Sequence, residues 1–223
     1  MDDTRRNETS GESPRHRWML TFSIAGDLRF ISHHDTLRLF QRALARAALP
    51  VRHSEGFNPH PRMTLPLPRP VGIASDAEAV IVEFDQSVAP DDLLQRLQRH
   101  TPADLNLFGV RRLAVGEHPR PNTVRYRIDP AETLIPDLAE RACRLLASSV
   151  VPVERTNPKK RGAVEVVDIR PYLVDIQTDD QAAVITLRVT GAGTAKPAEV
   201  ASFLGHPPGP MNHRIRRLEI QWE

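Results

Sequence analysis

The chain has 223 residues, of which 40% are hydrophobic and 26% are charged, a composition ordinary for a globular protein. It contains no apolar run near the roughly 20 residues that a membrane-spanning helix needs, and its N-terminus lacks the basic-then-apolar order of a signal peptide. We therefore expect a cytoplasmic protein that does not bind membranes.

The single cysteine limits the cofactors that this chain can hold. Cys143 stands in a helical pattern with Leu138, Ala142 and Leu145, which favours a buried and inert thiol. One cysteine forms no intramolecular disulfide, and an iron–sulfur cluster takes several cysteine thiolates. We expect no cofactor on this chain.

The first half of the chain follows a polar N-terminal tail. Residues 1–16 are polar and are expected to be disordered. Within a first domain, 17–115, the hydrophobic periodicity predicts a sequence of elements that reads strand, helix, strand, strand, helix, strand. These are strands at 18–24, 79–84 and 105–113, helices from Ser32 to about Ala48 and from Pro90, and a proline-rich extended edge at 58–70.

The same order of elements recurs in a second domain, 123–223, after a linker at 116–122. Its predicted strands are 124–128, 150–155, 182–189 and 215–222, and its predicted helices are 136–147 and 197–204. The order predicts an α+β fold made of two tandem ferredoxin-like (split βαβ) units, each an antiparallel sheet with helices on one face.

The helix that begins at Ser32 carries two different stripes. Ser32 is a typical N-cap residue, and Asp35 falls three positions later, where a carboxylate favours the helix dipole. One stripe is apolar and the other is cationic: Leu37, Phe40, Leu44 and Ala47 form the first, and Arg38, Arg42 and Arg46 form the second. The sequence predicts one face toward the core and a row of guanidinium groups on another.

Five segments of the chain form a recognisable set of motifs: Arg29-Phe-Ile-Ser-His33, the helix end 42–50, the loop Ser54-Glu-Gly-Phe-Asn-Pro-His-Pro61, the segment 70–75 and Asp168-Ile-Arg-Pro-Tyr172. Together they resemble the bacterial radical SAM-linked protein family, a domain encoded beside or fused to a radical SAM enzyme. The resemblance runs from about Trp18 to the C-terminus. It implies a radical SAM enzyme as partner, with S-adenosylmethionine and an iron–sulfur cluster on that enzyme. His34 departs from the pattern and receives no family role.

His33, Asp35 and His60 are the catalytic candidates. Histidine suits proton transfer near neutral pH, and Asp35 would fix the tautomer of a histidine if the loop folded back over the helix start. The alternative is that Asp35 only caps the helix and His60 only shapes a turn. A metal site is not expected, because His33 and His34 are adjacent and point apart on a helix.

The basic residues predict a structured RNA as ligand, with no DNA expected. The formal net charge is only +2, but the cations gather in patches that include the arginine stripe and Lys159-Lys160-Arg161 at a predicted hairpin tip. Phe57 and Asn58 offer a stacking surface and an amide that reads a base edge. The alternatives are a solvated charged surface and a Phe57 that fills the core.

These observations favour an RNA-binding accessory or substrate-presenting subunit, acting with a radical SAM enzyme in tRNA or rRNA modification. A second hypothesis is a metal-independent RNA-processing enzyme, similar to an endonuclease or a pseudouridine synthase, in which His33 or Asp35 is catalytic. A third is a scaffold that binds only its partner protein.

Overall fold

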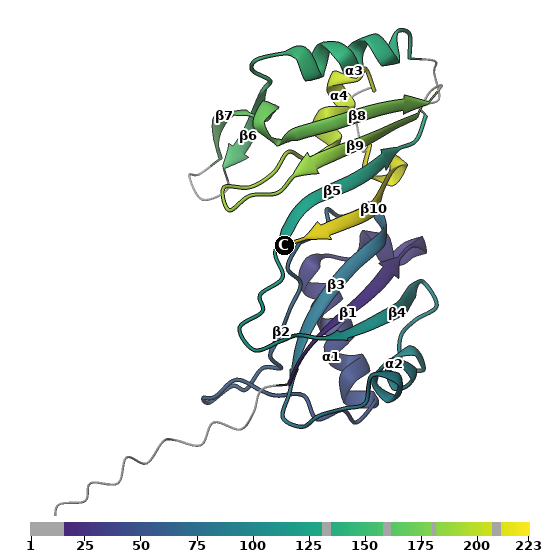
Figure 1. The fold of residues 1–223 in the computed structure, drawn as a ribbon, viewed down its shortest axis with the longest axis vertical. Coiled ribbons are helices and arrows are strands. Elements are labelled where there is room, and N and C mark those ends of the chain that lie inside the picture. The colour runs from purple at the N-terminus through teal and green to yellow at the C-terminus, as the bar shows by residue number, and fades with distance from the viewer. Residues whose placement is uncertain (1–15, 131–134, 158–161, 180–181, 207–210) are drawn as a thin grey trace, which may run out of the picture.

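The computed structural model describes residues 16–130, 135–157, 162–179, 182–206 and 211–223. These residues form four α-helices and a large sheet of mainly antiparallel strands, drawn in Figure 1. The helices are α1 (His33–Arg46), α2 (Pro90–Gln98), α3 (Leu138–Ala147) and α4 (Pro197–Phe203). The strands are β1 (His16–Ile24), β2 (Met63–Thr64), β3 (Ala74–Phe84), β4 (Leu105–Arg112), β5 (Pro121–Ile128), β6 (Pro152–Asn157), β7 (Ala163–Asp168), β8 (Leu173–Asp179), β9 (Ala182–Arg188) and β10 (Ile215–Trp222).

In the first half, the predicted strands and helices are confirmed to within a few residues. Strand β1 lies between β4 and β3, and both pairings are antiparallel. The short strand β2 pairs antiparallel with β3, as expected for an edge inside a proline-rich segment. Ser32 is the N-cap of α1, where its hydroxyl accepts a hydrogen bond from the Asp35 amide at 3.2 Å. A short 3-10 helix, η1 (Gly26–Phe30), connects β1 to α1.

In the second half, the strands run in the order β10-β5-β9-β8, and all neighbours are antiparallel. The strand predicted at 150–155 exists as β6, but it pairs with β7 in a separate two-stranded ribbon instead of joining the large sheet. Strands β7 and β8 were not predicted, and β8 forms an edge of the large sheet. Two more 3-10 helices are η3 (Arg170–Tyr172) and η4 (Met211–Arg214).

The two halves share one eight-stranded sheet. Strand β10 pairs in parallel with the start of β3, through Arg216 with Ala74 and Arg217 with Ser75. Two separate antiparallel sheets were predicted, and this parallel junction has no signature in the periodicity of either strand. The mixed α/β character is confirmed, whereas the tandem ferredoxin-like assignment is not.

A buried ion pair lies at the junction of the two halves. The guanidinium of Arg217 has no exposed surface, and it donates a hydrogen bond to the Glu78 carboxylate at 2.7 Å. It also donates to the Tyr126 hydroxyl at 3.1 Å and to the backbone carbonyls of Leu67 and Pro68. A buried charge is tolerated when it is paired and hydrogen-bonded, so these contacts explain how an arginine occupies a core position.

All four helices cover the same side of the sheet. Ser75 lies opposite Ile24, a residue of the first core, and Arg217 lies opposite Tyr126, a residue of the second core. Because Ser75 and Arg217 are themselves paired, and paired residues project to the same side of a sheet, both cores lie on one side. The other side of the sheet carries no helix within the described residues.

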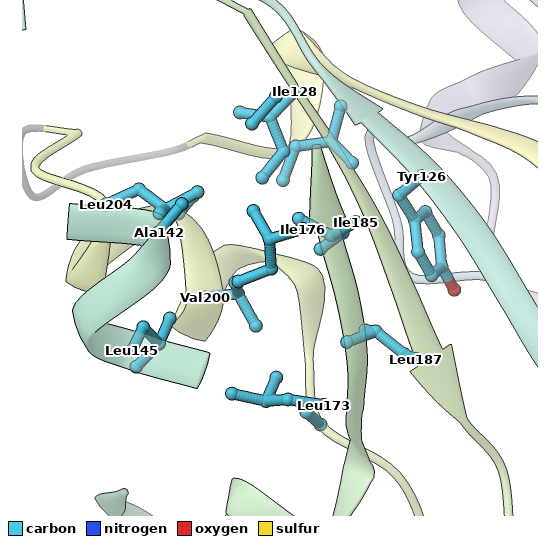
Figure 2. Close-up of a cluster of buried hydrophobic side chains, with 14 of the residues drawn as sticks. Tyr126, Ile128, Ala142, Leu145, Leu173, Ile176, Ile185, Leu187, Val200 and Leu204 are labelled. Atoms are coloured by element: carbon cyan, nitrogen blue, oxygen red, sulfur yellow. The ribbon is translucent and has the colours of Figure 1, made fainter. Parts of the chain in front are cut away.

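The helices pack on the sheet through the apolar faces that the sequence indicated. In the first half, the rings of Phe22 and Phe40 meet edge to face with centroids 4.9 Å apart. Figure 2 shows the second core, in which Ala142 of α3 and Val200 of α4 face Ile176 and Ile185 of the sheet. The prediction for Cys143 was wrong: the thiol is exposed, because the residue after buried Ala142 points away from the sheet.

None of the helices in the described ranges has both the length and the apolar character required to cross a membrane.

Candidate functional site

A groove of about 650 Å³ runs along α1. It lies between α1, η1 and the segment that follows α2. Cationic side chains dominate its lining, which consists of Leu28, Ile31, Asp35, Arg38, Leu39, Arg42, Arg46, Arg99, His100, Thr101 and Pro102. The predicted arginine stripe therefore lines a concave surface, here called the arginine groove, rather than a flat helix face.

The helical period of α1 places its arginines in the groove. Arg38, Arg42 and Arg46 recur every four residues, so they follow one side of the helix over about 12 Å. The end of the helix is held by Arg96 of α2, which donates hydrogen bonds to the carbonyls of Ala47 and Ala48. This contact fixes α1 beside the segment 99–102 and so sets the width of the groove.

The arginine groove carries an excess of positive charge. Arg38 contacts Asp35 at 3.2 Å, and Arg46 donates a hydrogen bond to the His100 carbonyl at 2.8 Å. Within the described part of the chain, Arg42 and Arg99 make no hydrogen bond or ion pair through their guanidinium groups. One carboxylate thus faces four guanidinium groups, and this surface favours a ligand with several negative charges.

Asp35 belongs to the helix start and to the groove. The hydrogen bond that it accepts from the Ser32 hydroxyl at 2.6 Å lowers its pKa, and Arg38 lowers it further. Asp35 therefore stays ionised near neutral pH and offsets part of the groove's charge. These contacts support the capping interpretation of Asp35.

His33 faces a different space from Asp35. It lines a small cavity of about 10 Å³ beside Arg69 and Glu78, which holds one water molecule at most. Burial lowers the pKa of the His33 ring, and the neighbouring His34 lowers it further. The ring is neutral near pH 7, and the cavity is too small for a substrate.

The structure does not bring His60 to His33. The loop that carries His60 is anchored at Glu83 of β3, which accepts a hydrogen bond from the Arg52 amide and donates one to the Arg62 carbonyl. His33 lies beside Glu78, five residues away along the same strand, or about 16 Å. The expected convergence of His33, Asp35 and His60 is not found.

The loop at 53–62 presents Phe57 to solvent. The side chain is fully exposed, so the alternative in which it fills the core is wrong. Asn58 and His60 are also exposed, and the His60 amide donates a hydrogen bond to the Ser54 hydroxyl at 3.0 Å, which closes the loop. The contacts between Ser54 and His60 hold the two ends of the loop together, so the residues between them project from the body of the protein. We call the loop at 53–62 the arm.

The arm and the arginine groove lie on opposite sides of α1. The base of the arm is hydrogen-bonded to Glu83 of β3. The groove opens instead toward the end of α2, and α2 packs on β4, the edge strand on the other side of β1. In Figure 1 the arm extends away from the body on the side opposite α2. The residues Phe57 and Asn58 therefore do not share one surface with Arg38, Arg42 and Arg46.

Two more sequence predictions concern the second half. Lys159, Lys160 and Arg161 lie outside the described residues, and strands β6 and β7 on either side of them pair antiparallel. The motif at 168–172 is structural. Asp168 accepts hydrogen bonds from the Val151 and Arg170 amides, and Arg170 caps α3 through the Leu146 and Ser148 carbonyls.

Sequence reasoning missed Arg99 and His100. These residues follow directly on α2, and their signal was a basic pair at the C-terminal end of a predicted amphipathic helix. The spacing along α1 indicated the stripe, but no local pattern indicated which other element would face it. Among the residues that the structure describes, no group of three or more His, Cys, Asp or Glu side chains is arranged to hold a metal ion.

Comparison with known proteins gives a family for most of the chain. Residues 17–197 match the model of a family described as an uncharacterized protein conserved in bacteria (DUF2344). No curated protein matches the sequence. The matched range includes the arginine groove and the arm, so both belong to the family domain.

Proposed function

The chain belongs to this bacterial family, and we propose that it is a cytoplasmic RNA-binding protein whose arginine groove holds the phosphates of a structured RNA. The observation that carries the proposal is the composition of the groove: four guanidinium groups and one carboxylate, with two of the guanidinium groups unpaired among the described residues. When guanidinium groups bind the phosphates of a polyanion, they release the counterions condensed on it, and this release favours binding.

The architecture supports the same proposal. The strand orders β4-β1-β3-β2 and β10-β5-β9-β8 are both the antiparallel 4-1-3-2 arrangement that a split βαβ unit gives, so we infer two ferredoxin-like units fused through β3 and β10. The arginine groove then lies on the helical side of the first unit. The arm offers Phe57 as a separate stacking contact for an unpaired base.

We further propose that the chain presents this RNA to a radical SAM enzyme, which supplies S-adenosylmethionine chemistry and the iron–sulfur cluster. The support is the resemblance of the motifs at 29–38 and 54–61 to the radical SAM-linked family. A binding role also agrees with the separation of His33 from His60, because proton transfer by both would need them within hydrogen-bond reach of one substrate.

The test measures RNA binding across a salt series. In a triple variant with Arg38→Gln, Arg42→Gln and Arg46→Gln, we expect weaker binding and a log–log salt slope that is smaller by about 2 for single strands, at about 0.7 per lost phosphate contact. A matched control replaces Arg125, Arg127 and Arg188, which lie on the helix-free side of the sheet, with Gln. The control removes the same charge and is expected to keep the wild-type slope.

The outcomes separate the three hypotheses. An unchanged slope in the triple variant, or an equal loss in the control, would contradict groove binding. Incubation of the pure protein with total cellular RNA gives the second readout: retained, intact RNA supports a binding protein, cleaved RNA supports a nuclease, and no retention leaves a protein-binding scaffold. Co-purification with a radical SAM enzyme from native cells tests the partner.

A further inference from the structure

A second groove lies in the other half of the molecule. It has a volume of about 320 Å³ and runs between α3 and the end of α4. Its lining consists of Arg141, Arg144, Leu145, Ser148 and Phe203. The volume falls within the range of small-ligand sites, and the lining combines two cations, one hydroxyl and one aromatic ring.

The position of Arg141 is fixed by its surroundings. Its Nε donates a hydrogen bond to the Pro136 carbonyl at 3.1 Å. Gly205, which follows α4, has a φ of +98°, and a Cβ at that position would lie 3.3 Å from the Arg141 Cζ. The absence of a side chain at Gly205 therefore lets the guanidinium reach the end of α4. A preorganised guanidinium loses little entropy when it binds a phosphate.

Arg144 and Phe203 are also available to a ligand, whereas the Ser148 hydroxyl donates a hydrogen bond to the Arg144 carbonyl at 2.8 Å. Arg144 faces Glu140 at 3.8 Å, and both side chains are 65% exposed, which makes this a weak pair that a phosphate can displace. Phe203 keeps 39% of its surface exposed although it ends a helix that packs on the core. A partly exposed ring beside two arginines suits a nucleotide, with the base on the ring and the phosphates on the guanidinium groups.

The second groove occupies the same place in its half as the arginine groove does in the first. Helix α3 follows β5 as α1 follows β1, and α4 connects β9 to β10 as α2 connects β3 to β4. Each groove is formed by the first helix of its half and by the end of the second helix. Both grooves also lie on the helical side of one continuous sheet.

We propose that Arg141, Arg144, Ser148 and Phe203 form a second nucleotide-binding site, and that one RNA strand bridges it to the arginine groove. This inference rests on the proposed function. Helix α1 packs on β1 and α3 packs on β8, five strand positions apart, which corresponds to about 24 Å. At a rise of about 3.4 Å per nucleotide, a stacked strand needs about seven nucleotides to span this distance.

The experiment titrates the full chain with oligouridylates from about 4 to about 16 nucleotides long. The wild-type protein is expected to bind two of the shortest oligonucleotides but only one of the longest, with a gain in affinity above about seven nucleotides. A variant with Arg141→Gln and Arg144→Gln should bind one short oligonucleotide, lose the gain with length, and show a salt slope smaller by about 1.4.

Two further variants keep the test specific. Replacing the same two arginines with lysine retains the charge and should keep most of the salt slope. Phe203→Leu retains an apolar side chain and the slope, but should weaken binding of the long oligonucleotide about tenfold through lost stacking. Thermal melts of each variant show whether the fold survives.

The outcomes distinguish this inference from the proposed function. If the Arg141→Gln, Arg144→Gln variant is folded and keeps the wild-type stoichiometry, length dependence and slope, the second site is overturned while the arginine groove stands. If the wild-type protein binds no oligonucleotide of any length, both proposals fall.

Discussion

The Arg217–Glu78 pair at the junction of the two halves gives a prediction about stability. Arg217→Met leaves the Glu78 carboxylate in the interior without its main cation. Removing one partner of a buried pair costs about 3–5 kcal/mol. Arg69 is also electrostatically coupled to Glu78, so we expect the lower end of that range for Arg217→Met.

The complementary variant should cost more. Glu78→Gln leaves the buried Arg217 and the half-buried Arg69, which repel each other, without a carboxylate beside them. We therefore expect a loss near the upper end, about 5 kcal/mol. Combining Arg217→Met with Glu78→Gln removes both charges, and the double variant should lose less free energy of unfolding than the sum of the two single changes.

Urea denaturation, followed by circular dichroism, measures these free energies. Arg216→Met is the matched control, because Arg216 occupies the next position and pairs with Asp76 at the surface. A half-exposed pair is worth about 0.2–1 kcal/mol, so the control should barely change the midpoint. Equal losses for Arg216→Met and Arg217→Met would refute the reasoning, as would a loss below about 1 kcal/mol for Arg217→Met.

Three other predictions follow from single residues. The exposed thiol of Cys143 should react with a thiol reagent in the native protein, and protection until unfolding would contradict its placement. Burial lowers the pKa of the His206 ring, so as the pH falls the unfolded chain binds a proton at this residue before the folded chain does. The free energy of unfolding should therefore decrease below about pH 6.5. In urea titrations at several pH values, His206→Gln should make this decrease smaller. Gly205→Ala places a side chain at a φ of +98°, 3.2 Å from the Ile135 Cγ2, and should lower the free energy of unfolding by at least about 1–2 kcal/mol in the same assay.

Local patterns were sufficient for most of the elements. Strands such as β1 and helices such as α1 were predicted because alternation and the 3.6-residue period are properties of neighbouring residues. The N-cap at Ser32 and the arginine stripe were predicted for the same reason. Strands β7 and β8 were missed: β7 exposes Val164 and Val166, which reverses the usual alternation signal, and β8 directly follows the turn at 170–172.

Some features of the candidate site were also predictable from local sequence, and others depended on how distant elements pack. The sequence indicated that Arg38, Arg42 and Arg46 share one face, because helical geometry requires it. It did not indicate that Arg99 and His100 face them, since that contact depends on how α2 packs beside α1. It also suggested that His60 meets His33, but the loop is anchored at the other end of β3.

The sequence by itself determined the kinds of element, their order and the charged face of α1, because these depend on residues within a few positions of one another. Only the tertiary structure decided which residues share a surface. The parallel pairing of β10 with β3 joins residues about 140 positions apart through the Arg217–Glu78 contact, and no local pattern encodes a contact at that separation. That pairing places both arginine-lined grooves on the same side of one sheet.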